Sequence, residues 1–276
     1  MTGQTYAPKE MIARLVGFDT TSNKSNLELI DCVRNYLAGH GVESTLVPSP
    51  EGDKASLFAT IGPKNEGGVA LSGHTDCVPV EGQPWSTDPF ATVEKDGRLY
   101  GRGTCDMKGF DALAIWALVE AHYEQVTRPL QLALSFDDEV GCTGAPPMIK
   151  AMQGAVPKGT AVIVGEPSML KAVTGHKGGN AFSTHVVGFE VHSSIHYKGV
   201  SAIHEGARLI HWATEQNDLN RSATPGPLAA MFDPPYTTWH VGRVSGGTAA
   251  NITAKECHFN LFYRSVPGDV PVIIVT

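Results

Sequence analysis

The feature that most constrains the fold is an alternation of β-rich runs with helical periodicity in the first part of this 276-residue chain. Strand-like runs lie at 57–61, 69–72, 130–136 and 161–164, and apolar residues recur at helical spacing over about 29–37, 107–123 and 144–152. Ser25 and Glu28 predict a capping box for the first of these helices. Strands that alternate with helices predict an α/β fold, a mostly parallel mixed sheet flanked by helices.

The pattern changes near Gly175. Residues 179–191 alternate like an antiparallel strand, a helical pattern covers 202–214, and strand patterns follow at 238–244 and 256–264. This order predicts most of a small α+β unit. We therefore predict two domains, one at 1–177 and a smaller one at 178–276.

Composition excludes several classes of protein. A net charge of −7 argues against nucleic acid or an anionic membrane as the main partner. No apolar run reaches about 18 residues, so no spanning helix is expected, and the N-terminal segment has no secretion signal. The five scattered cysteines contain no C-x-x-C pair, which favours reduced thiols in a cytoplasm over disulfides or a cysteine zinc module.

A histidine and an acid follow the predicted strand at 69–72. His74 and Asp76 are two positions apart, so both side chains leave the same face of an extended backbone. A metal-binding histidine needs its second ring nitrogen oriented by a carboxylate or a carbonyl, and Asp76 suits that role. Taken alone, the pair is more typical of a polar turn after a strand than of a metal site.

A third acid, Asp106, lies between a glycine-rich turn and the predicted helix at 107–123. The segment GRGTCDMKG carries this acid where a nucleotide-binding loop needs glycine, and no Walker lysine pattern is present. A phosphate site is therefore excluded. A carboxylate at this position suits a metal bridge, because its two oxygens can serve two cations.

Further carboxylates follow the other two strands. Asp137, Asp138 and Glu139 are consecutive, and Glu166 ends the run at 161–164. Neighbouring carboxylates repel one another unless a cation neutralises them, although a solvated acidic loop is the simpler interpretation. Ligand sites of such sheets gather at the carboxyl ends of the strands. We therefore expect these segments to meet at one edge and to bind metal.

The segments HTDCVP, GRGTCDMKG, the acid run and GEPS, in this order, resemble the zinc-dependent aminoacylase and carboxypeptidase family. FDDEVGCTGAP, GEPS followed by GHKG, and GGTAANI look most like the acetylornithine deacetylases within it. The resemblance covers the chain to Asp269. It implies a zinc-peptidase-like catalytic domain at 1–177, an inserted α+β lid for dimerisation at 178–276, and hydrolysis of N-acetyl-L-ornithine to L-ornithine and acetate by a homodimer.

The resemblance also implies a dinuclear zinc centre in a complete active site, in which Co²⁺ can replace zinc. The residues that match its metal ligands are His74, Asp106, Glu139 and Glu166, with Asp106 as the bridge. Asp138 stands where the family has its general base, which is usually a glutamate. Asp76 stands where the family has the acid that orients the zinc histidine.

In the second domain, His192 matches a histidine that reaches across the dimer to the substrate carbonyl. Asn251 and Arg264 match substrate-binding positions, and Arg264 suits a carboxylate through paired hydrogen bonds. The alternative for His192 and Arg264 is ordinary polar surface. The remaining histidines that we interpret as structural are His196, His204, His211, His240 and His258.

After RSVPGD the family continues with the rest of the lid and a returning segment that carries a histidine ligand, whereas this sequence ends VPVIIVT. From this we expect an incomplete chain. Three alternatives stay open: a desuccinylase of succinyl-diaminopimelate or a dipeptidase of the same family, an inert metal-binding fragment, and a thiol hydrolase that uses Cys77 or Cys105. The thiol hydrolase is the weakest, because no histidine and acid are assigned to either cysteine.

Overall fold

The computed structural model describes residues 4–269, and the apolar ending VPVIIVT lies outside the described residues. The chain separates into two compact units, Met1–Lys171 and Ala172–Thr276. The sequence places the boundary at 177/178, a few residues later. The two units are described separately.

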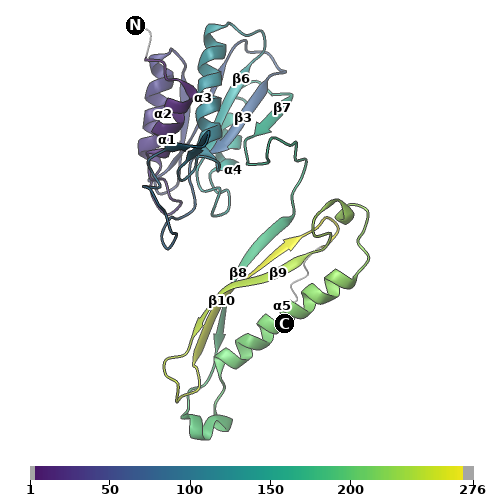
Figure 1. Ribbon diagram of the computed structural model, residues 1–276. Helices are drawn as coiled ribbons and strands as arrows, with labels where there is room; N and C mark the ends of the chain where they lie inside the picture. Colours follow the sequence, from purple (N-terminus) through teal and green to yellow (C-terminus); the bar gives the residue numbers. More distant parts are fainter. Residues whose placement is uncertain (1–3, 270–276) are drawn as a thin grey trace. The chain divides into compact units, whose positions relative to one another are not determined.

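The first unit is built on a five-stranded sheet in the order β1-β2-β6-β3-β7 (Figure 1). The strands are β1 (Ser44–Pro48), β2 (Ala55–Ile61), β3 (Val69–His74), β6 (Leu130–Ser135) and β7 (Ala161–Val164). β3 pairs in parallel with β6 and β7, whereas β1 with β2 and β2 with β6 are antiparallel. The sheet is mixed, as predicted, but parallel pairs are not the majority. The short link 49–54 allows only a hairpin between β1 and β2.

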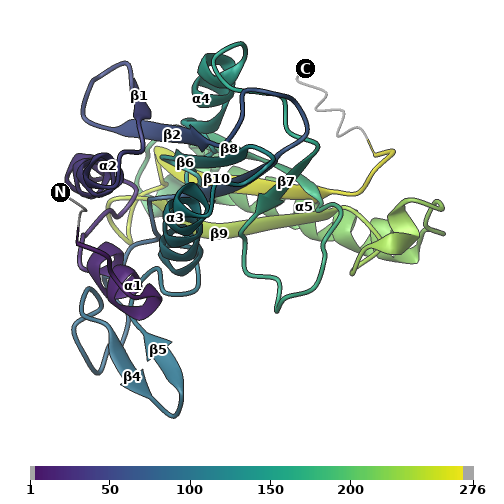
Figure 2. The same ribbon diagram turned by 90° about the horizontal axis from the view of Figure 1, so that it is seen from above.

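Helices cover both faces of this sheet. One face carries α1 (Pro8–Val16), α2 (Leu27–Gly39) and α3 (Lys108–Tyr123), and the other carries α4 (Ala145–Met152) (Figure 2). Side chains alternate accordingly: Leu57 packs into the large core with α2 and α3, whereas Phe58 packs with Met148 of α4. Neither α1 nor the small hairpin of β4 (Val93–Lys95) and β5 (Arg98–Tyr100) was predicted from the sequence.

The predicted capping box of α2 does not form. The N-cap residue is Asn26, whereas Ser25 Oγ accepts a hydrogen bond from the backbone nitrogen of Leu27 at 3.2 Å and donates one to the backbone oxygen of Asp53. The Asn26 side chain instead joins β2 to the residue that follows β3, because its amide donates to the backbone oxygen of Ala55 and to Thr75 Oγ1, both at 2.8 Å. Tertiary hydrogen bonds therefore displace the local cap.

The second unit is a three-stranded antiparallel sheet, in the order β8-β10-β9, with one long helix along it (Figure 1). Its elements are β8 (Gly178–Val187), η1 (Ser193–Lys198), α5 (Ala202–Ser222), η2 (Ala229–Met231), β9 (Thr238–Gly246) and β10 (Glu256–Ser265). Cys257, Phe259 and Leu261 of β10 pack with Ala202 and Ala213 of α5. The alternate residues of β10 are exposed on the other face. In neither unit do the described residues include a helix with the length and apolar character that crossing a membrane requires.

The core of the first unit predicts a clear contrast between two leucines of α3. Leu118 is 0% exposed, whereas Leu113 is 45% exposed. Leu118→Ala should lower the free energy of unfolding by about 2–5 kcal/mol, because it removes buried methyl groups and leaves a cavity. Leu113→Ala should change it by less than about 0.5 kcal/mol. Denaturant titrations followed by circular dichroism measure both, and equal effects would contradict the packing described.

Candidate metal centre

Parallel pairing brings three acid-bearing segments to one edge of the first sheet. His74, the last residue of β3, is level with Ser135 at the end of β6, and Ser72 is level with Val164 at the end of β7. The residues that follow these strands therefore emerge side by side, at the edge where such sheets bind ligands. Asp106 reaches the same place from another element, the turn that precedes α3.

His74 lies at the centre of this group of acids and is only 2% exposed. Its Nδ1 lies 3.0 Å from the backbone oxygen of Asp76, which can only accept, so Nδ1 is the donor. Its Nε2 faces three carboxylates, with Asp106 at 3.1 Å, Glu166 at 3.6 Å and Asp138 at 4.0 Å. This is the arrangement in which a histidine presents Nε2 to a metal while a backbone carbonyl fixes its ring.

Asp76 ties this histidine to the acidic loop. Its carboxylate accepts hydrogen bonds from Ser22 Oγ at 2.7 Å and from the backbone nitrogens of Asp138 at 3.0 Å and Glu139 at 3.3 Å. Burial alone would raise the pKa of Asp76, but the bonds from His74, Ser22 and Asp138 outweigh it and lower the pKa. Asp76 therefore stays ionised. Ser22 carries no sequence signal for this role, and only the fold places it there.

Of the three consecutive acids, Asp137 has a different partner from Asp138 and Glu139. Asp137 Oδ1 accepts from Lys54 Nζ at 2.5 Å, and both side chains are largely buried. This ion pair neutralises Asp137 without a metal. Asp138 and Glu139 remain with the acids around His74. This segment therefore contributes two carboxylates to the mutual repulsion there, and not three.

The side chains around His74 can form two overlapping sets of metal ligands. His74, Asp106 and Glu139 form one set, and His74, Asp138 and Glu166 form the other; together these five residues are called the carboxylate cluster below. In each set the candidate ligand atoms lie within 4.8 Å of one another. Imidazole nitrogen and carboxylate oxygens suit zinc and its first-row neighbours. The donor set therefore fits a divalent transition metal.

The electrostatics of the carboxylate cluster fit a bound cation. Burial, followed by the neighbouring Asp106 carboxylate, raises the pKa of Glu139. Burial likewise raises the pKa of Glu166, opposed by His74 and reinforced by Asp106. Burial lowers the pKa of His74, but Asp76 and then Asp138 more than offset this and raise it to about 10. Without metal, the cluster thus holds a proton on its only imidazole.

A buried acid behind the carboxylate cluster was not found from the sequence. Asp111 is 0% exposed, and neither of its carboxylate oxygens has a hydrogen-bond partner among the described residues. Burial raises its pKa well above the ordinary value. A Cβ at Gly73 would lie 2.0 Å from Asp111 Oδ1, so only glycine fits before His74. On a helix, an acid ordinarily predicts a solvent-facing position, which is why Asp111 was missed.

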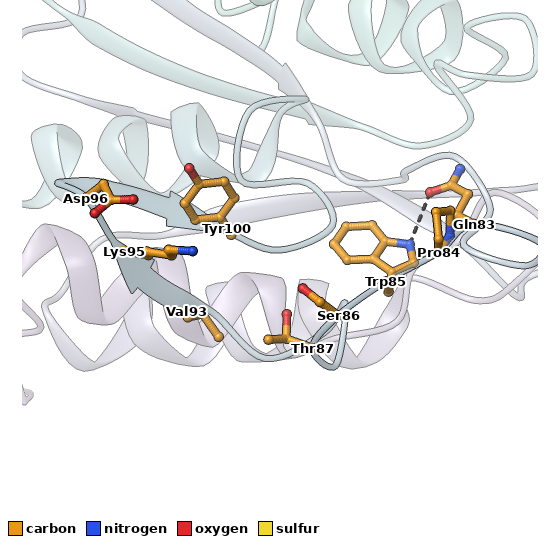
Figure 3. Close-up of a pocket in the computed structure, with 9 residues that line it drawn as sticks. All are labelled: Gln83, Pro84, Trp85, Ser86, Thr87, Val93, Lys95, Asp96 and Tyr100. Carbon is orange, nitrogen blue, oxygen red and sulfur yellow. Dashed lines mark hydrogen bonds between the residues drawn. The ribbon is translucent and has the colours of Figure 1, made fainter.

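A surface pocket of about 390 Å³ lies elsewhere in the first unit (Figure 3). It is lined by Gln83, Pro84, Trp85, Ser86, Thr87, Val93, Lys95, Asp96 and Tyr100. Trp85 Nε1 donates to Gln83 Oε1 at 3.1 Å, which fixes the indole ring at one side of the pocket. None of these residues belongs to the carboxylate cluster, so the pocket and the cluster are separate features.

In the second unit, His192 and Asn251 are neighbours, whereas Arg264 is remote from both. His192 is the N-cap residue that precedes η1, and its Nδ1 accepts from the backbone nitrogen of Ser194 at 3.2 Å. The backbone nitrogen of Ser193 donates to the oxygen of Asn251 at 2.8 Å. Arg264 lies at the opposite end of β10, about 26 Å along the strand from Glu256. Within one copy of this unit, the three residues are therefore too far apart to form one site.

The structure weakens the thiol alternative. Cys77 is buried, and burial raises the pKa of its thiol, which disfavours the reactive thiolate. Cys105 is exposed, and no hydrogen bond joins it to a histidine among the described residues. Within residues 4–269, neither cysteine is hydrogen-bonded to the base that a thiol nucleophile needs.

Comparison with known proteins identifies relatives over most of the chain. The model for peptidase family M20/M25/M40 matches residues 70–265. The acetylornithine deacetylase of Myxococcus xanthus is 38% identical over 276 residues, which cover 98% of this chain and 70% of that protein. That of Proteus mirabilis is 37% identical over 255 residues, covering 91% and 63%. The chain thus spans 63–70% of the length of these two relatives.

Solved structures show the same fold. A metallo-carboxypeptidase of the M20 family from Sulfolobus solfataricus superposes with a TM-score of 0.78 at 15% identity, over 97% of this chain and 73% of that chain. Human carnosine dipeptidase 1 superposes with a TM-score of 0.65 at 16% identity, over 95% and 70%. These comparisons confirm the family resemblance drawn from the sequence motifs. The chain belongs to peptidase family M20/M25/M40, a family of metal-dependent amide hydrolases.

Proposed function

We propose that the protein deacetylates N-acetyl-L-ornithine to L-ornithine and acetate, a step of arginine biosynthesis. The observation that carries a hydrolytic role is the buried His74 surrounded by carboxylates at the sheet edge. The choice of substrate is supported by deacetylase relatives that are 35–38% identical. The catalytic domain of this proposal is 1–177, and the lid is 178–276.

We propose that a complete active site holds two zinc ions at the carboxylate cluster, with Co²⁺ as a substitute. His74, Asp106 and Glu166 would hold one ion, Asp106 would bridge, and Glu139 would serve the second. The short separations of His74 Nε2 from Asp106 and Glu166 support these three residues as ligands of the first ion. Zinc supplies Lewis acidity, which lowers the pKa of a coordinated water and polarises the amide carbonyl.

Asp138 is the proposed general base, which takes the proton of the attacking water and passes it to the leaving amine. Its backbone is fixed by the bond to Asp76, so the shorter aspartate side chain works from a defined position. The Cys142 thiol donates to Asp138 Oδ1 at 3.2 Å, which further limits its rotation. Asp76 would act indirectly, by holding both His74 and the loop of the base.

The lid geometry supports a homodimer. An N-acyl amino acid spans roughly 10 Å, about the reach of three extended residues. It cannot touch Arg264 and the His192–Asn251 pair of one lid, because these lie at opposite ends of β10. In a dimer, one copy would supply Arg264 for the substrate carboxylate and the other would supply His192 and Asn251. The five unpaired cysteines suit a cytoplasmic enzyme.

The direct test of this function is a substrate panel assayed with excess Zn²⁺ or Co²⁺. Release of ornithine from N-acetyl-L-ornithine should exceed turnover of N-succinyl-diaminopimelate and of dipeptides in kcat/KM. Asp138→Asn should lower kcat by about 100-fold or more at unchanged metal content, since it removes the base. Preference for another substrate would reassign the enzyme within the family, and no turnover of any substrate would indicate an inert metal-binding chain.

The metal assignment predicts opposite behaviour for two variants. His74→Ala should lose most of the metal retained after dialysis, because it removes the only imidazole of both candidate sets. Asp137→Asn should retain it, because Asp137 is paired with Lys54 and lies outside those sets. Elemental analysis of the purified variants gives the metal per chain. Full retention in His74→Ala would place the metal elsewhere.

The proposed role of Arg264 predicts a specific kinetic change. Arg264→Lys should raise KM for N-acetyl-L-ornithine by about 10-fold or more with a smaller effect on kcat, because an ammonium cannot replace the planar, two-pronged contact to a carboxylate. Arg243→Lys, on the neighbouring strand β9, is the matched control and should leave KM unchanged. Equal KM values for the parent and Arg264→Lys would remove Arg264 from the substrate site.

A further inference from the structure

We propose that the exposed face of the second unit's sheet carries a separate metal site, formed by His185, Glu256 and His258, for Zn²⁺ or a similar transition cation. His185 of β8 lies directly opposite His258 of β10 in the antiparallel register. The two rings stack with centroids 4.2 Å apart and planes 12° from parallel. β8 and β10 are neighbouring strands joined by backbone hydrogen bonds (Figure 1). They thus hold the two imidazoles side by side.

A carboxylate completes the group. Glu256 precedes His258 by two positions on the same strand, so both side chains leave the same face of the sheet. Glu256 Oε1 lies 4.0 Å from His185 Nε2, and Oε2 lies 3.7 Å from His258 Nε2. These two histidines are its only ion-pair partners among residues 4–269. No lysine or arginine of that range therefore competes with a cation for this carboxylate.

The donor types select the class of metal. Two imidazole nitrogens and one carboxylate oxygen are the ligands of zinc and of nickel or copper, whereas calcium and magnesium prefer oxygen alone. One candidate ligand atom from each residue lies within 4.8 Å of the other two. In a tetrahedral zinc site with bonds of about 2.0–2.1 Å, ligand atoms are about 3.3 Å apart. All three side chains are about half exposed, so small rotations can close this gap.

The proposed site is distinct from the carboxylate cluster. It shares no residue with that cluster and lies in the other unit. From the sequence, His258 is interpreted as structural. Its neighbour His185 is far away along the chain, and only the strand register brings the two together. A metal bound here would cross-link β8 and β10 through its ligands. Binding to the folded state alone would stabilise this unit by an amount that rises with the logarithm of the metal concentration above Kd.

The test compares Zn²⁺ binding in three variants with the parent chain. His185→Gln and His258→Gln should each bind one Zn²⁺ fewer per chain, or bind it more than about 100-fold more weakly, since a ligand is lost outright. His211→Gln is the matched control, because His211 of α5 lies 3.5 Å from Glu215 in a histidine–glutamate pair without a second histidine. It should bind as the parent does. Isothermal titration after saturation of the carboxylate cluster gives the number of ions.

Two further measurements distinguish zinc at this site from zinc at the carboxylate cluster. In a His74→Ala background the additional ion should still bind, because the carboxylate cluster does not contribute to it. Zn²⁺ should shift the imidazole NMR signals of His185 and His258 together, and Glu256→Gln should reduce the shift while preserving the side-chain shape. If the parent, His185→Gln and His258→Gln bind equal numbers of ions with equal affinity, or if the two signals do not move, the proposal is wrong.

Discussion

The repulsion among carboxylates gathered around one buried imidazole is the interaction on which the first unit depends. Parallel pairing of β3 with β6 and β7 forces the acids together, because their strands end at one edge. Hydrogen bonds offset part of this repulsion. The Asp76 carboxylate accepts them from Ser22 and from two backbone nitrogens of the acidic loop. The carboxylates around His74 Nε2 leave the site negatively charged. A divalent cation and a proton compete for this nitrogen, and the cation displaces the proton when metal is supplied.

Rigidity around this site comes from groups that take no part in chemistry. Lys54 neutralises Asp137 and fixes one side of the acidic loop, while the close approach of Asp111 requires glycine at position 73. The large core beneath is apolar and shared by α1, α2, α3 and the sheet. Polar side chains at the edge are therefore positioned by a packed apolar scaffold.

The second unit distributes its functional residues differently. Its sheet buries one face against α5 and exposes the other, so exposed side chains of β8 and β10 stand in rows along the strands. The length of β10 separates Arg264 from His192 and Asn251, which supports a site shared between two copies. The same rows place His185 beside His258, and cross-strand register decides this neighbourhood.

Local periodicity was enough to predict β2, β3, β6, β7 and the strands of the second unit, together with α2, α3, α4 and α5, but not β1, the β4–β5 hairpin or α1. It also showed that His74, Asp138, Glu139 and Glu166 follow strand ends, where ligand sites of such sheets gather. Their separate roles, as metal ligands or as the base, came from the family resemblance. Periodicity did not reveal that Asp137 forms an ion pair with Lys54 or that Ser22 donates a hydrogen bond to Asp76. It also did not reveal that the side chain of Asn26 bonds to β2 and makes no capping hydrogen bond to α2. Those choices depend on contacts between segments distant in the chain. The order of residues thus establishes which side chains stand at the sheet edge, whereas packing between distant segments selects the partner that each one meets.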